Sequence, residues 1–397
     1  MPTRPPALVR LAPALTLIAA LAARPTVGRA AGDGAPAVDL RHITLTDAGA
    51  TAPVVGGGRA ELTLDPGLQR AAARLLSQAN PAAGAVVAID ARTGRVLAWA
   101  EHGAAHPGEV LLERQAPSAS VFKVVTTAAL LEHSPVSTSE KICYEGGLHT
   151  VELRHLRAPR GGEGVRCTHF GVALGHSINA VYAQLATRYL MRDDLVNTAA
   201  RVGFNQSVPF DVPIRLGRIE IPYNDLAFAR TATGFIDSTL SPLGATWLAY
   251  VVASGGAAVR PHIVRRAGDW EAPPEREVVG RVFQPRTARI LRRMMEVTVN
   301  SGTSHEAFTD ESQRSYLPGI QVAGKTGTLR PSPSSPTTSW FIGFAPSKSP
   351  RIVVGVLLEN RRVWRRKANQ VARDVLRVWF ARDARYPRVT DPLAPAQ

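Results

Sequence analysis

The chain has 397 residues, 45% of them hydrophobic and 20% charged, so it can bury a substantial core and does not have the composition of a disordered protein. Its net charge of +15 comes from basic residues scattered along the chain, and no basic run is interleaved with aromatic residues, which argues against nucleic-acid binding. Such a charge favours attraction to an anionic surface, such as a membrane or a charged polymer.

The N-terminus has the pattern of an export signal. Two arginines precede an apolar stretch over residues 11–22, and small residues follow around Ala30. The apolar stretch is short for a bilayer span and Pro13 interrupts it. We therefore expect residues 1–30 to be a cleaved signal peptide, with an uncleaved membrane anchor as the alternative. Either one predicts an exported protein, in the periplasm or on the outer face of the cytoplasmic membrane.

Residues 31–60 are rich in Gly, Ala and Pro and are expected to form a linker. A helix should begin at Asp65, because this residue precedes a proline and apolar residues follow at helical spacing over 68–76. Two apolar runs, 84–90 and 95–100, flank a short turn that ends in glycine. This pattern predicts a β-hairpin.

The middle of the chain predicts mainly helices. Residues 120–132 are apolar on nearly every face, which indicates a buried helix that begins at Ser120. Residues 133–170 read as loops, and a helix returns over 172–189. Residues 223–254 are mostly apolar and helical, with a break at Pro242.

The last part predicts an amphipathic helix, three strands and a closing helix. Their ranges are 286–299 for the first helix, 321–329, 339–345 and 351–358 for the strands, and 368–381 for the last helix. Because a hairpin comes early and three strands come late, the order predicts an α+β fold. In it, one antiparallel sheet is assembled from both ends of the domain.

The chain has two cysteines, Cys143 and Cys167, which lie 24 residues apart. An even pair in an exported protein suggests a disulfide, which would stabilise the fold by about 3 kcal/mol in the chain-entropy model. Two buried free thiols are an alternative. A zinc site is another, and it would draw on His149, His155, His169 and His176. Only Cys167-Thr168-His169 is compact, and it is tight for one ion, so we expect no metal.

Only five of the 47 basic residues are lysines, and two of these occur where arginine could not replace them chemically. Lys123 follows Ser120 by three residues, which on a helix places amine and hydroxyl on neighbouring turns of one face. A desolvated lysine can lose its proton and act as a base, whereas arginine stays protonated. The pair therefore has the pattern of a nucleophile beside its base.

Two further motifs accompany this pair. Ser177-Ile178-Asn179 follows a helical turn, so its hydroxyl and amide can both face a cleft. Lys325-Thr326-Gly327-Thr328 lies on an expected strand, where the glycine allows a ligand backbone to approach closely. Each motif also has a plain interpretation as a helix cap, a surface lysine, a polar turn or a hairpin element. The agreement of all three favours the catalytic interpretation.

The three motifs in this order resemble the signature of class A β-lactamases and penicillin-binding proteins. The chain is similar to the transpeptidase domain of penicillin-binding proteins over about residues 61–382. The matching segments are 116–123, 173–182 and 324–328, with flanks at 84–100, 240–243, 301–303 and 340–343. The resemblance implies an antiparallel sheet flanked by N- and C-terminal helices, with a mainly helical subdomain. Residues 383–397 would then be a C-terminal tail.

The resemblance also implies a mechanism without a cofactor. Ser120 would attack a D-Ala-D-Ala peptide bond with Lys123 as base, and the backbone N–H groups of Ser120 and Thr328 would form the oxyanion hole. Ser177 would relay a proton to the leaving group and Asn179 would hold the donor peptide and the lysine. Lys325 and Thr326 would bind the substrate carboxylate, and Gly327 would let the substrate approach the strand. The implied partners are peptidoglycan stem peptides, β-lactam antibiotics and a cell-wall synthesis complex.

Several alternatives stay open at this point. With water as the acyl acceptor, the same site would be a D,D-carboxypeptidase. A β-lactamase of the class D kind shares nucleophile and base but must activate a water, and no glutamate is clearly placed for that task. A non-catalytic β-lactam sensor or scaffold belongs to a different class of protein. A sensor would need a signalling domain, and none is visible in the sequence.

Overall fold

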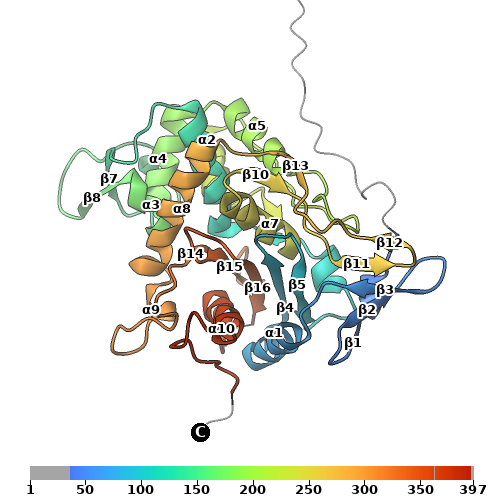
Figure 1. Cartoon of the computed structure of the whole chain (residues 1–397). Coiled ribbons are helices and arrows are strands. Elements are labelled where there is room, and N and C mark those ends of the chain that lie inside the picture. The colour runs from blue at the N-terminus through green and yellow to red at the C-terminus, as the bar shows by residue number, and fades with distance from the viewer. Residues whose placement is uncertain (1–35, 362, 395–397) are drawn as a thin grey trace, which may run out of the picture.

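The computed structural model describes residues 36–361 and 363–394, so the expected signal peptide or anchor at 1–30 lies outside the described residues. A five-stranded antiparallel sheet in the order β14-β15-β16-β4-β5 forms the centre of the molecule (Figure 1). Its strands are β4 (Ala83–Asp90), β5 (Val96–His102), β14 (Ala323–Leu329), β15 (Thr337–Ala345) and β16 (Ile352–Asn360). The early hairpin joins the late strands where β4 pairs with β16, which confirms the expected sheet built from both ends of the domain.

Helices cover both faces of this sheet. The helices α1 (Pro66–Ala79) and α10 (Ala368–Ala381) lie side by side on one face (Figure 1). Helix α1 begins where the sequence predicts, because the Asp65 side chain accepts a hydrogen bond from the Leu68 N–H at 2.7 Å. On the other face, α7 (Pro242–Ala253) packs so closely that a Cβ at Gly355 would lie 2.0 Å from the Thr246 hydroxyl.

A helical subdomain stands beside the sheet (Figure 1). It contains η3 (Ala119–Phe122), α2 (Lys123–His133), α3 (Phe170–His176), α4 (Asn179–Tyr189), α5 (Arg192–Val202), α6 (Asp225–Thr233) and α8 (Pro285–Asn300). The short helix α9 (His305–Phe308) follows α8 and packs beside α10. The single helix expected over 172–189 is two helices, because Ser177 adopts a left-handed conformation with φ +56° and ends α3. Helix α5 was not expected from the sequence.

The expectation of a linker over 31–60 does not hold for its described part, residues 36–60. This segment forms η1 (Leu40–His42), β1 (Thr44–Leu45), β2 (Ala50–Pro53) and β3 (Arg59–Leu62), which join β11 (Val264–Ala267) and β12 (Trp270–Glu271) in a second sheet. The alanines that suggested a linker are core residues, since Ala50, Ala52 and Ala60 are buried. Gly56, Gly57 and Gly58 form the turn between β2 and β3, all with positive φ.

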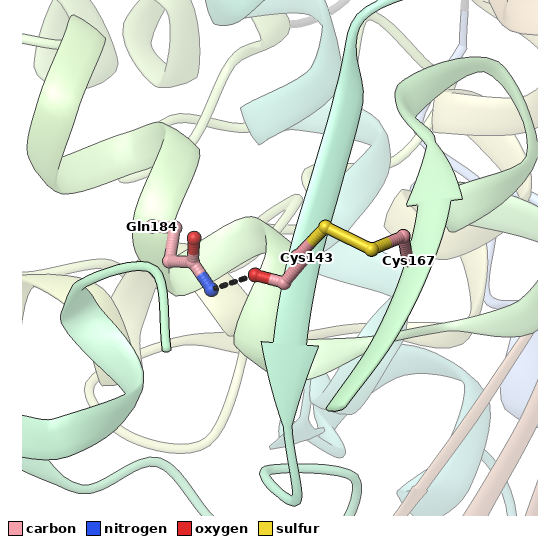
Figure 2. The surroundings of a disulfide bond; sticks show 3 residues. All are labelled: Cys143, Cys167 and Gln184. Atoms are coloured by element: carbon pink, nitrogen blue, oxygen red, sulfur yellow. Dashed lines mark hydrogen bonds between the residues drawn. A yellow bond between two sulfur atoms is a disulfide. The ribbon is translucent and has the colours of Figure 1, made fainter. Parts of the chain in front are cut away.

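The segment 133–170, expected to be loops, contains a hairpin of β7 (Lys141–Glu145) and β8 (Val165–His169), with η4 (Leu153–Leu156) between the strands. Cys143 and Cys167 are direct cross-strand partners and form a disulfide (Figure 2). Gln184 of α4 donates to the Cys143 carbonyl at 3.2 Å and fixes the hairpin to the helical subdomain. With both sulfur atoms in this bond, neither cysteine has a thiolate to offer zinc.

The remaining short elements are η2 (Glu109–Glu113), β6 (Ala116–Pro117), β9 (Thr239–Leu240), β10 (Ala257–Val259) and β13 (Val278–Arg281). Part of the expected tail packs on the domain, since Val389 is buried and Tyr386 meets Phe380 edge to face at 5.1 Å between ring centroids. Within residues 36–361 and 363–394, every helix is too short or too polar to span a bilayer.

Reduction of the Cys143–Cys167 bond is expected to lower the melting temperature. The entropic estimate of about 3 kcal/mol is an upper limit, because strain and residual structure usually reduce the effect. Thermal unfolding with and without reductant measures it, and a Cys143→Ser/Cys167→Ser double variant should not respond to reductant. Alkylation of both cysteines without reductant, seen by intact mass, would show that the bond is absent in solution.

Candidate active site

The three predicted motifs meet in one cleft of about 480 Å³ between the helical subdomain and the edge strand β14. Its lining residues come from all three motifs and from five other segments: Ala119, Ser120, Leu148, His149, His176, Ser177, Asn179, Thr233, Gly234, Phe235, Thr303, Thr326, Thr328, Leu329, Ser339, Trp340, Trp364, Lys367 and Asn369. No aspartate or glutamate occurs among these described residues. Lys123 and Lys325 lie just behind the surface of the cleft and are fully buried.

The nucleophile candidate lies on a tight turn that leads into a buried helix. Ser120 belongs to η3, and Lys123 begins α2 directly after it, so the helix expected from Ser120 opens with a 3₁₀ turn. The preceding residue, Ala119, has φ +47°, a conformation that costs a non-glycine residue roughly 1 kcal/mol or more. Gly234 accommodates this turn, because a Cβ there would lie 1.9 Å from the Ala119 carbonyl oxygen.

Lys123 is a buried amine surrounded by oxygen atoms. Its Nζ lies 2.8 Å from Ser120 Oγ, 2.5 Å from Asn179 Oδ1 and 3.0 Å from the Thr233 carbonyl oxygen. Burial, followed by the charge of nearby Lys325, holds the pKa of Lys123 well below its usual range. Its neutral, basic form is therefore more accessible than that of an ordinary lysine.

The orientation of the Asn179 amide is fixed by a second contact. Its Nδ2 donates to the Leu148 carbonyl oxygen at 2.6 Å, and a carbonyl can only accept. The amide oxygen must therefore face Lys123, where it accepts a hydrogen bond from Nζ. The same segment is held by a backbone bond from Ala180 N–H to the Gly147 carbonyl at 3.0 Å, so the loop before η4 orients the active-site amide.

These partners also orient the lone pair of the neutral amine. A neutral amine has two N–H donors and one lone pair, and two of the three partners of Lys123 are acceptors only. Ser120 is the one partner that can donate a proton. The two N–H bonds therefore go to Asn179 and Thr233, and the lone pair faces the serine hydroxyl, as a general base requires.

A second serine–lysine pair faces the first. The left-handed turn at Ser177 places its hydroxyl 3.1 Å from Lys325 Nζ, which also donates to the Thr326 carbonyl at 2.7 Å. Burial lowers the pKa of Lys325 to about 7, so this amine exchanges its proton near neutral pH. The Thr326 hydroxyl instead contacts the Thr303 hydroxyl at 2.6 Å.

Glycine at position 327 keeps β14 close to the nucleophile. A Cβ there would lie 3.2 Å from both Ala119 Cβ and Val121 Cγ2, so a larger residue would press against η3. Thr328 follows on the strand and is exposed in the cleft. The site residues from all three motifs thus converge on the Ser120 turn.

Several residues of the site were not singled out as site residues from the sequence. Thr233 and Leu148 act through backbone carbonyls, which leave no side-chain signature in a sequence. Trp340 donates from Nε1 to the Pro117 carbonyl at 2.8 Å and ties the central sheet to the start of the η3 turn. Thr303, which contacts Thr326, lies in the segment 301–303. The match of this segment to the family pattern was the sequence feature that could have identified it as a site residue.

Comparison with known proteins identifies the family. The model of the penicillin binding protein transpeptidase domain matches residues 84–377. Peptidoglycan D,D-transpeptidase PbpA of Mycobacterium tuberculosis is 28% identical over 347 residues, which are 77% of this chain and 68% of that protein.

Stage V sporulation protein D of Bacillus subtilis is 26% identical over 332 residues, 76% of this chain and 49% of that protein. A solved imipenem acyl-enzyme complex of penicillin-binding protein A from M. tuberculosis has a TM-score of 0.67 and 25% identity, and the match covers 82% of this chain and 80% of that one. The chain therefore belongs to the penicillin-binding protein transpeptidase domain family.

Proposed function

We propose that this protein is a serine D,D-transpeptidase that acylates Ser120 with the D-Ala-D-Ala stem peptide and cross-links peptidoglycan. The observation that carries the proposal is the Lys123 amine, whose two acceptor-only partners leave its lone pair to the Ser120 hydroxyl. The names of the relatives support the same reaction, and a solved relative carries a β-lactam as an acyl-enzyme.

In the proposed acylation, Ser120 Oγ bonds to the carbonyl carbon between the two D-alanines while its proton passes to Lys123 Nζ. The C–N bond then breaks, and the leaving amine takes a proton through Ser177, which lies against Lys325. Asn179 holds the donor peptide and keeps Lys123 in place. An amine of a neighbouring stem peptide attacks the ester, releases Ser120 and forms the cross-link.

Substrate binding is assigned to β14. The Thr326 hydroxyl would bind the terminal carboxylate of the donor, with Lys325 supplying positive charge from behind the strand. Gly327 lets the peptide backbone lie along the edge strand, and the N–H groups of Ser120 and Thr328 would stabilise the oxyanion. No cofactor takes part in this scheme.

The cleft favours this reaction over that of a β-lactamase. An efficient β-lactamase needs a base that activates water against the acyl-enzyme, and the described lining residues include no carboxylate. A D,D-carboxypeptidase would use the same residues with water as acceptor. The ordered contacts of Ser120, Lys123 and Asn179 argue against a non-catalytic sensor or scaffold.

The test is covalent labelling with a fluorescent penicillin, followed by intact mass and by the lifetime of the adduct. A transpeptidase should carry one penicillin for hours, whereas turnover in well under a second would show a β-lactamase. Incubation with a D-Ala-D-Ala stem peptide should release D-Ala, and an added amine acceptor should divert the product from hydrolysis to a cross-linked peptide. Absence of any adduct would overturn the proposal.

The same function implies a location and partners. We propose that the protein is exported and works in the periplasm or on the outer face of the cytoplasmic membrane. Its N-terminal segment would either be cleaved as a signal peptide or hold the protein at the membrane as an anchor. Its partners would be stem peptides, β-lactam antibiotics and a cell-wall synthesis complex. Fractionation of cells followed by penicillin labelling tests this, and label confined to the cytoplasm would contradict it.

Lys325→Arg should be tolerated far better than Lys325→Ala in acylation by a penicillin. Arginine keeps a positive charge near the carboxylate, although its greater length can misplace the peptide. The charge also matters for Lys123, whose pKa it lowers. Because the reactive form of Lys123 is neutral, loss of this charge should move the acidic limb of the pH–rate profile to higher pH in Lys325→Ala.

The measurement is the second-order acylation rate of the wild type and both variants across pH with one penicillin. Lys325→Arg should keep the acidic limb of the wild type, because below pH 7 both the wild-type lysine, with its pKa of about 7, and arginine are charged. Equal losses for the two variants would mean that Lys325 acts by proton transfer or strict geometry and not by charge.

A further inference from the structure

The cleft extends to the far face of β14. Successive residues of a strand point to opposite faces, so Lys325 and Gly327 face Ser120 while Thr326 and Thr328 face away from it. On that far face, Thr326 contacts Thr303, and Thr328 pairs in register with Ser339 of β15. We call these four residues, Thr303, Thr326, Thr328 and Ser339, the hydroxyl half of the cleft.

The hydroxyl half leads to the beginning of α10. Ser339 Oγ accepts a hydrogen bond at 3.2 Å from the N–H of Ala368, the first residue of this helix. The residue before it, Lys367, is exposed and lines the cleft together with Trp364. The residue that precedes α10, Lys367, therefore brings a charged side chain to the end of the cleft that is lined by hydroxyl groups.

Lys367 is the one lysine or arginine among the described lining residues of the cleft. Over residues 36–361 and 363–394, no carboxylate lies within ion-pair distance of its amine, and none lines the cleft. Lys123 and Lys325 are fully buried and already bonded to protein oxygen atoms. Among the described lining residues, Lys367 is thus the one exposed lysine or arginine, beside the exposed histidines His149 and His176 and neutral hydroxyl groups.

We propose that Lys367 recruits the carboxylate of the donor substrate into the hydroxyl half of the cleft, an inference that rests on the proposed function. The hydroxyl groups of Thr303 and Thr326 can donate hydrogen bonds to carboxylate oxygens but supply no charge. Lys325 loses part of its charge near neutral pH, since burial lowers its pKa to about 7. An exposed lysine at the rim supplies the attraction that guides an anionic substrate inward. Lys367 is therefore a specificity residue for ligands that carry a carboxylate.

The experiment separates binding from chemistry. Stopped-flow acylation gives the dissociation constant of the non-covalent complex and the rate of the chemical step for the wild type, Lys367→Met and Lys367→Arg. Lys348→Met is the matched control, because Lys348 is an exposed lysine that does not line the cleft. Methionine keeps the backbone N–H of residue 367, which donates to the Gln370 side chain at 2.8 Å, so α10 should begin normally. Each variant is tested with one penicillin and with its methyl ester, which lacks the carboxylate.

For the penicillin, Lys367→Met should weaken binding about twofold to fivefold and leave the chemical step unchanged, the size of effect expected for one partly exposed charge contact. Lys367→Arg should restore binding, and Lys348→Met should match the wild type. Added salt should weaken penicillin binding to the wild type more than to Lys367→Met. The methyl ester should not distinguish Lys367→Met from the wild type.

Unchanged penicillin binding in Lys367→Met would overturn the inference. Equal losses for penicillin and ester would also overturn it, because Lys367 would then act through packing. Both outcomes require a wild type that is acylated by penicillin. A wild type that forms no adduct would instead contradict the proposed function itself.

Discussion

Ser120→Ala should abolish covalent labelling by penicillin while the protein stays folded. The substitution removes only the hydroxyl, which is the atom proposed to form the ester bond. Lys123 loses one of three partners and keeps Asn179 and Thr233, so its amine is not left without hydrogen bonds. A half-buried position at a cleft surface then costs little stability. Gel fluorescence after labelling, with intact mass, measures the loss.

The control is Ser312→Ala, which removes an exposed hydroxyl that does not line the cleft. This variant should label like the wild type. Circular dichroism and the melting temperature of Ser120→Ala establish that it is folded. Label that persists on folded Ser120→Ala would remove this serine from the role of nucleophile, and peptide mapping of the adduct would then identify the residue that carries it.

Much of the central sheet could be predicted because its signals are local. The hairpin at β4 and β5 and the three late strands are short apolar runs between turn residues, and the structure pairs them in one sheet. Lys123 is conspicuous in the sequence for a chemical reason, because nearly all the other basic residues of this chain are arginines. Residue types at fixed spacing can be recognised directly in a sequence, and so the three motifs could be found without the structure.

What could not be predicted depends on long-range contacts. The segment of β2 and β3 resembles a linker until β3 pairs with β11, some 200 residues later, in a sheet whose alanines Ala50, Ala52 and Ala60 are buried. The break at Ser177 is a left-handed backbone conformation inside an apolar helical pattern, which periodicity does not reveal. Thr233 and Leu148 enter the site through carbonyl oxygens that every residue has. The motifs therefore located the site, and the contacts that orient Lys123 required the structure.

Lys123→Arg should be nearly as inactive in acylation as Lys123→Ala. Arginine keeps the positive charge but does not lose its proton at working pH, so it cannot accept the proton of Ser120. The surroundings of Lys123 add a geometric reason. Three oxygen atoms lie within 3.0 Å of one nitrogen, in a site with no solvent exposure, and a planar guanidinium cannot present a single atom to all three.

The measurement is the second-order rate of acylation by one penicillin for the wild type and both variants, with Lys348→Arg as a control for the substitution itself. Lys348 is exposed and does not line the cleft, so this control should retain the wild-type rate. The melting temperature shows whether each variant folds. If folded Lys123→Arg kept more than about a tenth of the wild-type rate, a barrier change below roughly 1.4 kcal/mol, then Lys123 would act by charge alone. In that case the lone pair that faces Ser120 would not be the base.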